Sequence, residues 1–333
     1  MSGAEAVSRV GAVAIGRNEG ARLIACLDSL QGLGRVVYVD SGSTDGSVAA
    51  AEARGAEVVR LDTARPFTAA RARNAGLARL REAGPTPGYV QLVDGDCTLD
   101  PGWVATALAF LEATPRAAVA CGRRRERHPE ASIYNRLCDR EWNTPVGRAR
   151  NCGGDALVRM AALEQVGDFR ADMIAGEEPE LCVRLRKQGW EIWRLDAAMT
   201  RHDAGLTRLS QWWTRARRTG HAYAERMALH GGPPLRDGVR GTLNPLAWGL
   251  GPPVAALGLG LVHPAGVAVL AVYPLQVLRL ARREGGGREG WTVAALTVLG
   301  KIPETLGVLH YALARLAHRP ARLMEYKGSA GHD

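Results

Sequence analysis

The sequence lacks several patterns that mark common protein classes. Its six cysteines include no Cys-x-x-Cys pair and are too sparse for a small disulfide-stapled domain, so we expect reduced thiols. The first nine residues are polar, which predicts no secretory signal and an N-terminal part in the cytoplasm. No Gly-x-Gly-x-x-Gly follows the first apolar run, where only Gly11 and Gly16 occur. A dinucleotide-dependent oxidoreductase is therefore disfavoured.

Lysine is also nearly absent. Only Lys187, Lys301 and Lys327 occur, so arginine, which can hold phosphate bidentately, carries almost all of the positive charge. The net charge is +9, but the 43 basic residues are interleaved with 34 acidic ones, so we expect no nucleic-acid partner. With 333 residues, the chain is long enough for two domains, or for one large domain with an appendage.

Short apolar runs alternate with helical patterns through the first hundred residues. The runs lie at 10–15, 36–39, 58–61 and 89–93, and the third and fourth are separated by a helical pattern over 68–83. This alternation predicts an α/β fold, a Rossmann-like and mostly parallel sheet with helices on both faces. Ligands of such sheets bind beyond the carboxyl ends of the strands, so the loops after Ile15, Val39 and Val93 are the expected binding loops.

Acidic residues stand at two of these predicted strand ends. Asp94 and Asp96 flank Gly95 directly after the fourth strand, and alternation lets both carboxylates project to the same side. Mg2+ and Mn2+ take such oxygen ligands and complete their shells with water and substrate phosphates, so we interpret Asp-Gly-Asp as a metal and diphosphate site; a polar turn is the alternative. Asp40 ends the second strand, where it either accepts hydrogen bonds from a ribose or base, or caps the following turn.

A second acidic turn precedes a later helical pattern. Pro179 suits the first position of a helix, which makes Glu178 the expected N-cap of a helix that ends near Gly189. A carboxylate at the positive end of a helix dipole tends to stay ionised, as a general base requires. On local chemistry alone, Glu177 and Glu178 are either general-base candidates or helix caps.

A long stretch without charge follows in the C-terminal third. As one helix, the 38 residues 241–278 would reach about 57 Å, nearly twice a ~30 Å hydrocarbon core, and His263-Pro264 interrupts them. We therefore expect a hairpin of two short membrane helices with both ends in the cytoplasm, because arginines flank it on both sides. Five prolines favour the alternative, a buried or interfacial element. The stretch 291–316 is expected to be an amphipathic helix on lipid or on the domain.

Several separated motifs, in order over about residues 9–225, resemble the inverting family 2 glycosyltransferases with the GT-A fold. Arg17-Asn18-Glu19 resembles the opening loop of that family, 39–46 its nucleotide-binding turn, and 71–76 its Arg-Asn-x-Gly helix start. Asp94-Gly95-Asp96 resembles its metal-binding DxD. Gly153-Gly154-Asp155 is similar to its Gly-Gly-Asn segment, with Asp in place of Asn, and Glu177-Glu178 takes the place of a Glu-Asp pair whose second member is the catalytic base.

The resemblance implies a GT-A glycosyltransferase domain over 1–228, with a nucleotide-binding half (9–100) and an acceptor half (101–228), followed by a hydrophobic membrane-associated region over 229–333. It implies Mg2+ or Mn2+ as cofactor, a nucleotide-diphosphate sugar as donor, a lipid-linked or envelope glycan as acceptor, and work at the cytoplasmic face of the inner membrane. The expected nucleotide-sugar-binding residues are Arg17, Asn18, Glu19, Asp40, Ser41, Gly42, Ser43, Asp45, Arg71, Arg73, Asn74, Asp94, Gly95, Gly153, Gly154 and Asp155.

Three further expectations come from the resemblance. Asp96, Asp94 and His202 are the expected metal ligands, and Glu178, with Glu177 as second candidate, is the expected base. Gln211-Trp212-Trp213 departs from the Gln-x-x-Arg-Trp spacing of processive members, so we expect single transfer. The substitutions at Asp155 and Glu178 leave one alternative open, a non-catalytic nucleotide-sugar-binding scaffold of the same fold.

Overall fold

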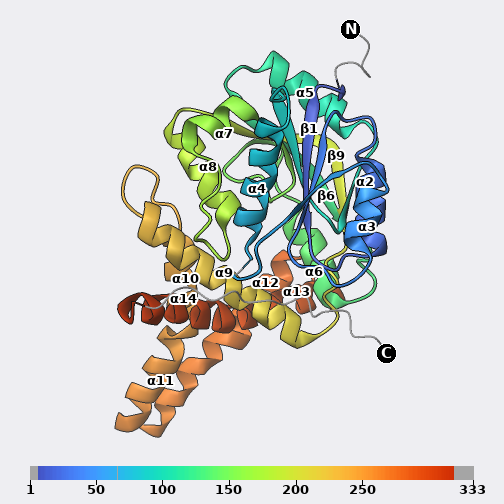
Figure 1. The fold of residues 1–333 in the computed structure, drawn as a ribbon. Helices are drawn as coiled ribbons and strands as arrows, with labels where there is room; N and C mark the ends of the chain where they lie inside the picture. Colours follow the sequence, from blue (N-terminus) through green and yellow to red (C-terminus); the bar gives the residue numbers. More distant parts are fainter. Residues whose placement is uncertain (1–6, 66, 319–333) are drawn as a thin grey trace. The chain divides into compact units, whose positions relative to one another are not determined.

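The computed structural model describes residues 7–65 and 67–318 (Figure 1). The chain forms two compact units, which meet in the sequence between Gly205 and Leu206. This division comes earlier than the domain boundary expected after residue 228. The difference concerns helix α9 (Leu209–His230), which packs against α10 and α14 of the second unit. Those parts of the expected domains that fall on 1–6, Pro66 and 319–333 lie outside the described residues.

The first unit is built on one mixed sheet, which has nine strands within the described residues, in the order β3-β2-β1-β4-β8-β6-β9-β5, with β7 paired to β9. Strands β1 to β4 and the pair β6 and β9 run parallel, whereas β8 is antiparallel to its neighbours β4 and β6. The mostly parallel sheet predicted from the sequence is confirmed. The strands are β1 (Val10–Gly16), β2 (Val36–Asp40), β3 (Glu57–Arg60), β4 (Tyr89–Asp94), β5 (Cys97–Leu99), β6 (Ala117–Glu126), β7 (Gly147–Ala149), β8 (Ala156–Arg159) and β9 (Glu191–His202).

Helices cover both faces of this sheet. Figure 1 shows α4 on one side of β1, with α2 and α3 on the other. Because helices lie on both faces, the central strands are buried throughout, which explains their continuous apolar runs. The helices of the unit are α2 (Ala21–Ser29), α3 (Ser47–Glu52), α4 (Ala69–Glu82), α5 (Trp103–Ala113), α6 (Ile133–Glu141), α7 (Met160–Val166) and α8 (Glu177–Lys187).

The register of the parallel strands aligns their carboxyl ends. Ile15 of β1 lies opposite Val39 of β2 on one side and opposite Asp94 of β4 on the other, and Gly16 lies opposite Asp40. The loops after these three strands therefore leave the sheet at one edge, as the sequence predicts.

Helix α8 begins differently from the prediction. Gly176 occupies the N-cap in a left-handed conformation with φ of 79°, which favours glycine over glutamate. Glu178 lies inside the first turn, so its prediction as the N-cap is wrong. Pro179 is the third helical residue, a position where the missing N–H costs no intrahelical bond.

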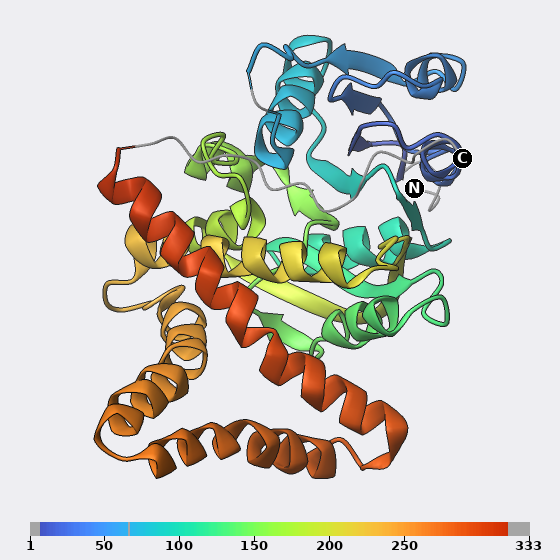
Figure 2. The same ribbon diagram turned by 90° about the horizontal axis from the view of Figure 1, so that it is seen from below.

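The second unit is helical. Its elements are α9, α10 (Val239–Gly249), α11 (Gly251–Val262), the 3-10 helix η1 (Pro264–Ala271), α12 (Val272–Arg283), α13 (Gly287–Leu299) and α14 (Lys301–Leu316). Figure 2 shows α14 running across α9. At this crossing, a Cβ on Gly220 would lie 1.9 Å from the Glu304 carbonyl oxygen, and one on Gly307 would lie 1.9 Å from that of Arg217. The two helices approach so closely because both residues are glycine.

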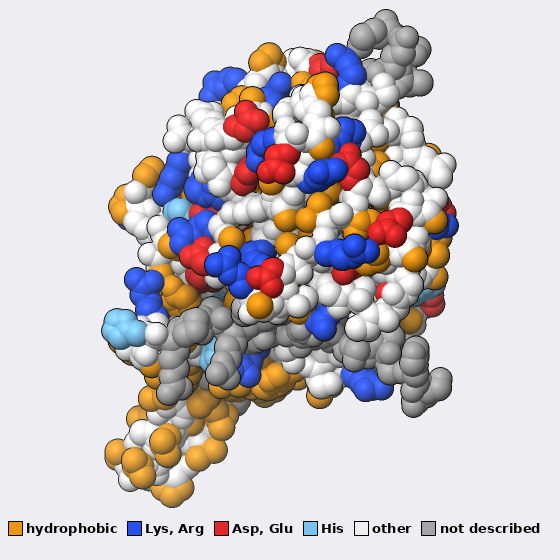
Figure 3. Space-filling view, viewed as in Figure 1, with side chains coloured by type: hydrophobic (Ala, Val, Ile, Leu, Met, Phe, Trp, Pro, Cys, Tyr) orange, Lys and Arg blue, Asp and Glu red, His pale blue; other side chains and the backbone are white. Residues whose placement is uncertain are grey.

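Apolar helices dominate this unit. Within the described residues, three segments are long and apolar enough to cross a membrane: Val239–Val262, Pro264–Arg283 and Gly287–Leu316. The chain turns at His263, as expected for a hairpin, and α11 packs against η1. Leu257, Leu261 and Val262 of this hairpin are 68%, 81% and 85% exposed. Figure 3 shows hydrophobic side chains over the hairpin surface. The stretch expected to form one amphipathic helix over 291–316 is divided at Gly300 into α13 and α14.

Candidate active site

The loops after β1 and β2 are fastened to each other at the carboxyl edge of the sheet. Asn18 donates its backbone N–H to Ser43 Oγ at 2.9 Å, and its Oδ1 accepts the Thr44 N–H at 2.8 Å. Gly20 N–H donates to Ser47 Oγ at 3.2 Å. Asn18 has a φ of 55°, a conformation that asparagine tolerates better than most residues. Two predicted nucleotide-binding segments, Arg17 to Glu19 and Ser41 to Asp45, thus form one structure.

Asp40 organises the second of these loops. Its Oδ2 accepts the N–H groups of Gly42 and Ser43 at 3.0 and 2.9 Å, and Tyr38 donates its hydroxyl to Oδ1 at 3.2 Å. These bonds match the capping alternative from the sequence. Contact of Asp40 with a nucleotide stays a prediction.

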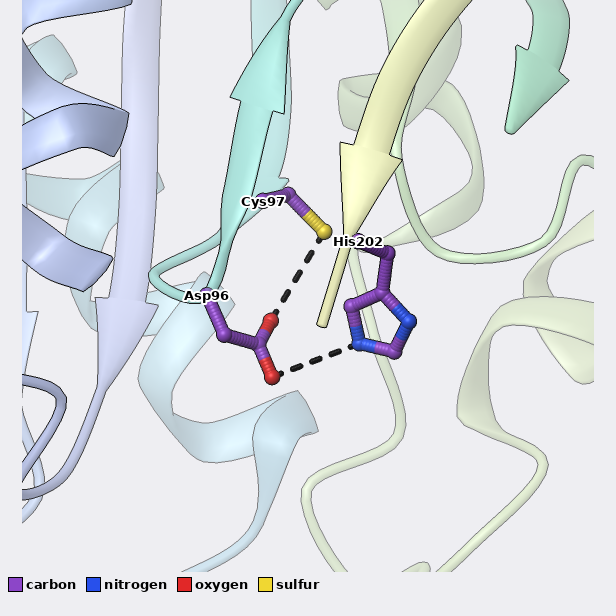
Figure 4. A group of neighbouring side chains, drawn as sticks. All are labelled: Asp96, Cys97 and His202. Carbon is purple, nitrogen blue, oxygen red and sulfur yellow. Dashed lines mark hydrogen bonds and ion pairs between the residues drawn. The ribbon is translucent and has the colours of Figure 1, made fainter. Parts of the chain in front are cut away.

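Asp96 and His202 lie together, although 106 positions separate them in the sequence. Strand β5 pairs with β9 so that Cys97 lies opposite His202. Asp96 Oδ2 is 3.3 Å from His202 Nε2, and Cys97 Sγ is 3.6 Å from Asp96 Oδ1 (Figure 4). Both Asp96 and His202 are buried, and the ring edge of His202 meets Trp142 with 4.7 Å between centroids.

This group fits a divalent metal. The ligand atoms of Asp96, Cys97 and His202 all lie within 4.8 Å of one another. A carboxylate and an imidazole suit Mn2+, and a carboxylate suits Mg2+. Burial, followed by the carboxylates of Asp155 and Asp96, raises the pKa of Cys97 well above its usual value. The carboxylate oxygens and the imidazole nitrogen of the group are the ligand atoms that Mg2+ and Mn2+ prefer over sulfur.

Asp94 belongs to a different set of contacts. Arg73, with a side chain only 3% exposed, donates to Asp94 Oδ1 at 2.8 Å and to Glu177 Oε1 at 2.7 Å. Burial would lower the pKa of Arg73, but the two carboxylates outweigh it and raise that pKa. Asp94, predicted as a metal ligand, and Glu177, predicted as a candidate base, are thus bridged by one buried guanidinium.

Gly95 brings the Asp-Gly-Asp turn against the end of β1. Its N–H donates to the Ile15 carbonyl at 2.8 Å, and a Cβ at this position would lie 3.1 Å from the same oxygen and 3.4 Å from Glu19 Cγ. The backbone at Gly95 thus approaches β1 closely.

Asp155 is fully buried and its contacts are internal. Its carboxylate faces Arg124 Nη2 at 2.8 Å and accepts the Thr200 hydroxyl at 2.9 Å and the Asp94 N–H at 3.1 Å. Burial would lower the pKa of Arg124, but the carboxylates, led by Asp155, raise it. The charge of Asp155, where the family has Asn, is therefore matched by a buried arginine.

Gly153 and Gly154 lead into this buried pair. Both have positive φ values, 86° and 94°, which favour glycine. A Cβ on Gly154 would lie 3.4 Å from Arg124 Nη2 and 3.5 Å from Arg73 Nη2. The glycine loop thus passes directly over both buried guanidinium groups, and only a small residue fits there.

Glu178, in the first turn of α8, faces the loop that contains Cys152. It is 7% exposed, and its Oε1 accepts the Cys152 N–H and, at 3.0 Å, the thiol of Cys182. The two sulfur atoms are 3.9 Å apart. Both hydrogen bonds of Glu178 go to Oε1.

The side chains of two residues predicted to bind the nucleotide sugar form hydrogen bonds with the protein backbone instead. The Arg71 guanidinium donates to the carbonyls of Arg65 and Asp62 at 3.0 and 3.2 Å. Asn74 donates its Nδ2 to the Phe169 carbonyl at 2.7 Å and accepts the Phe169 N–H at 3.0 Å. Their amide and guanidinium groups support neighbouring loops rather than the metal group.

Reasoning from the sequence missed Arg124 and the two cysteines beside Glu178. Strand alternation among the basic residues 123–125 was the available signal for Arg124. Arg123 and Arg125 both bond Asp139, whereas Arg124 points to the other face and meets Asp155. For the cysteines, the spacing of Cys182 four residues after Glu178 on a helix was the only local signal.

Part of the chain matches the model of a known protein family. Residues 14–154 match the family model described as glycosyl transferase family 2. A comparison with curated protein sequences finds no match. This match lies within the first unit and confirms the resemblance of its motifs to that family.

Solved structures share the fold. The chain is similar to the mannosyltransferase PcManGT from Pyrobaculum calidifontis in complex with GDP-Man and Mn2+, with 22% identity and a TM-score of 0.60 over 87% of this chain and 86% of that one. Glucosyl-3-phosphoglycerate synthase from Mycobacterium tuberculosis has 19% identity and a TM-score of 0.51 over 70% and 83%. TarS 1–349 from S. aureus has 12% identity and a TM-score of 0.50 over 93% and 92%. These similarities establish the GT-A fold.

Proposed function

We propose that this protein is a metal-dependent inverting glycosyltransferase, which moves one sugar from a nucleotide diphosphate to a lipid-linked or envelope glycan acceptor at the cytoplasmic face of the inner membrane. The observation that carries the proposal is the grouping of Asp96 and His202, 3.3 Å apart, beside the edge where β1, β2 and β4 end. The family match to residues 14–154 supports the reaction class.

The donor would lie along this edge. The fastened loops of Asn18 and Asp40 would hold the nucleoside at this edge. Asp96 and His202, with Asp94 beside them, would hold Mg2+ or Mn2+. When bound, the metal supplies positive charge next to the departing diphosphate. The PcManGT structure contains GDP-Man with Mn2+, which supports a divalent metal in this fold.

Glu178 is the better of the two base candidates. Glu177 Oε1 is engaged by the buried Arg73 at 2.7 Å, whereas the bonds of Glu178 come from an N–H and a thiol and use Oε1 alone. Inversion requires the acceptor hydroxyl to attack the anomeric carbon from the side opposite the diphosphate. Glu178 Oε2 would take the hydroxyl proton during this attack. Glu177 would then act through Arg73 on the position of Asp94.

The acceptor assignment depends on the second unit. Its exposed apolar hairpin, and the basic Arg279, Arg282 and Arg283 that follow, fit a membrane surface with anionic lipids. A transferase held there would meet acceptors that are themselves anchored in lipid. A membrane-bound acceptor is the choice most consistent with this surface.

The test uses the purified full chain in detergent micelles. Nucleotide sugars are first screened for a rise in melting temperature with Mn2+ present, because a ligand that binds the folded state raises it. Transfer from the best donor is then measured for wild type, Asp96→Ala, Glu178→Gln and the surface control Asp172→Asn. We expect Glu178→Gln to lose about 10²–10⁴-fold in rate while keeping donor binding. Asp96→Ala should lose metal-dependent turnover, and Asp172→Asn should resemble wild type.

Normal turnover by Asp96→Ala would refute the metal assignment. A wild-type protein that binds a nucleotide sugar with Mn2+ but neither transfers nor hydrolyses it would establish the scaffold alternative instead.

A further inference from the structure

The side chains of Cys152, Glu178 and Cys182 form a second group of potential metal ligands in the first unit. One ligand atom from each lies within 4.8 Å of the others. Cys182 follows Glu178 by four positions on α8, so both face the same side of the helix, and Cys152 comes from the loop before Gly153. None of the three residues belongs to the group of Asp96 and His202.

The spacing of the sulfur atoms suits tetrahedral coordination. Zinc–sulfur bonds of about 2.3 Å at a tetrahedral angle place two sulfur atoms about 3.8 Å apart. The observed separation of Cys152 Sγ and Cys182 Sγ is 3.9 Å. A zinc-bound carboxylate oxygen would lie about 3.6 Å from each sulfur, whereas Glu178 Oε1 is 3.0 Å from Cys182 Sγ. A small rotation of the Glu178 carboxylate would lengthen its distance to Cys182 Sγ to this value. The rotation becomes possible because the thiol proton that bridges Oε1 and Sγ leaves when the cation binds.

Electrostatics favour a cation over a disulfide at this place. Cys182 is buried and Cys152 is partly buried; their thiols hydrogen-bond each other, and both have a raised pKa. A thiol that resists ionisation reacts slowly with peroxides. A divalent cation, by contrast, neutralises both thiolates as they form and takes the place of their protons.

We propose that Cys152, Glu178 and Cys182 bind a thiophilic divalent cation such as Zn2+, and that this cation inhibits the enzyme by occupying Glu178. The thiolate ligands distinguish this site from the Mg2+ or Mn2+ site, because soft cations prefer sulfur and hard cations prefer oxygen. Binding itself depends only on the three side chains. The inhibitory effect rests on the proposed function of Glu178 as the base.

Cobalt is the probe, because thiolate–Co2+ bonds give a charge-transfer absorption that oxygen ligands do not. The reduced full chain is titrated with Co2+ in the presence of saturating Mg2+, and Zn2+ is then added as competitor. We expect one Co2+ per chain and loss of the absorption on addition of Zn2+. Cys152→Ser and Cys182→Ser should abolish the absorption. Glu178→Gln should weaken Co2+ binding at least about tenfold, because the loss of even an outer-shell partner typically costs that much.

Cys97→Ser is the matched control, because Cys97 is the thiol of the other group. An absorption that survives Cys182→Ser and disappears in Cys97→Ser would move the site to Asp96 and overturn the proposal, as would no thiolate absorption in wild type. The wild-type protein gives a readout that needs no variant. At an alkaline pH and a reaction time at which Cys152 is fully alkylated without Zn2+, Zn2+ should protect it, as measured by peptide mass spectrometry, and unchanged alkylation would also refute the site.

Transfer assays separate the two proposals. Zn2+ at saturating Mg2+ should inhibit wild type, and inhibition should be at least about tenfold weaker in Cys182→Ser. If cobalt binds as expected but the protein transfers no sugar, the cation site stands and the proposed function fails. If transfer proceeds and cobalt binds without any inhibition, the site is not a regulatory one.

Discussion

Replacing Asp155 by asparagine should destabilise the first unit, even though asparagine is the residue that the family has in the corresponding segment. The substitution keeps the shape of the side chain and one acceptor oxygen, which serves the Asp94 N–H, while the amide nitrogen in place of Oδ2 can donate to the Thr200 hydroxyl oxygen. It removes the charge that faces Arg124 at 2.8 Å, and Arg124 is itself only 12% exposed. A buried guanidinium is then left without its main partner.

The size of the effect follows from the burial of the pair. Removing one member of a buried ion pair costs about 3–5 kcal/mol, and we expect about 3 kcal/mol here because Asp94 and Asp96 remain near Arg124. Replacing both members by uncharged residues is often neutral. The double variant Arg124→Met with Asp155→Asn should therefore recover most of the stability that Asp155→Asn loses.

Native-state hydrogen exchange, read by mass spectrometry on peptides from β4 and β8, measures this in the first unit alone. A loss of about 3 kcal/mol corresponds to exchange about 140-fold faster. The control Asp172→Asn removes an exposed pair with Arg170, worth at most about 1 kcal/mol, so exchange should change less than about fivefold. If exchange in Asp155→Asn rises less than about fivefold, Asp155 does not compensate a buried charge. The same conclusion follows if the double variant exchanges as fast as the single variant.

Two further predictions concern the second unit. Leu257→Arg should reduce partitioning into liposomes by roughly 60–300-fold, since an arginine in the hydrocarbon costs about 2.5–3.5 kcal/mol. The control Val146→Arg, at a 57% exposed site of the first unit, should leave partitioning unchanged. Equal binding of both variants in liposome co-sedimentation would argue against the hairpin as the membrane contact. Burial, with nearby positive charge, lowers the pKa of His221 to about 4. The folded state therefore binds fewer protons than the unfolded state between pH 4 and 6.5, so stability should fall as the pH drops through this window, by about 2 kcal/mol at pH 5. Thermal melts at pH 7 and pH 5 should differ much less for His221→Gln, and an unchanged difference would contradict this assignment.

The arrangement of the first four strands was predictable because it depends on local patterns. Strands buried on both faces carry continuous apolar runs. The runs at 10–15, 36–39 and 89–93 end within one residue of the carboxyl ends of β1, β2 and β4, respectively. The shared edge then follows from the parallel arrangement. The break at His263 was likewise visible, because the residue before a proline is biased towards an extended conformation, which His263 adopts.

The partners of the site residues were not predictable in this way. Arg73 and Arg124 meet their carboxylates only because distant segments pack together, over 21 positions to Asp94 and over 31 positions to Asp155. The proximity of His202 to Asp96 depends on the pairing of β5 with β9, and β5 is too short to show a pattern. The N-cap of α8 was missed because proline tolerates several positions of a first turn.

The position of Arg73 affects how a mutational survey of this enzyme would be interpreted. One guanidinium restrains two acids from different segments, so an alanine at any of the three sites would disturb the other two. Similar losses of rate in the three alanine variants would then reflect one shared electrostatic interaction, and would not show that all three residues take part in the chemistry. Only paired substitutions, compared with their single counterparts, separate a residue that reacts from one that merely holds its neighbour.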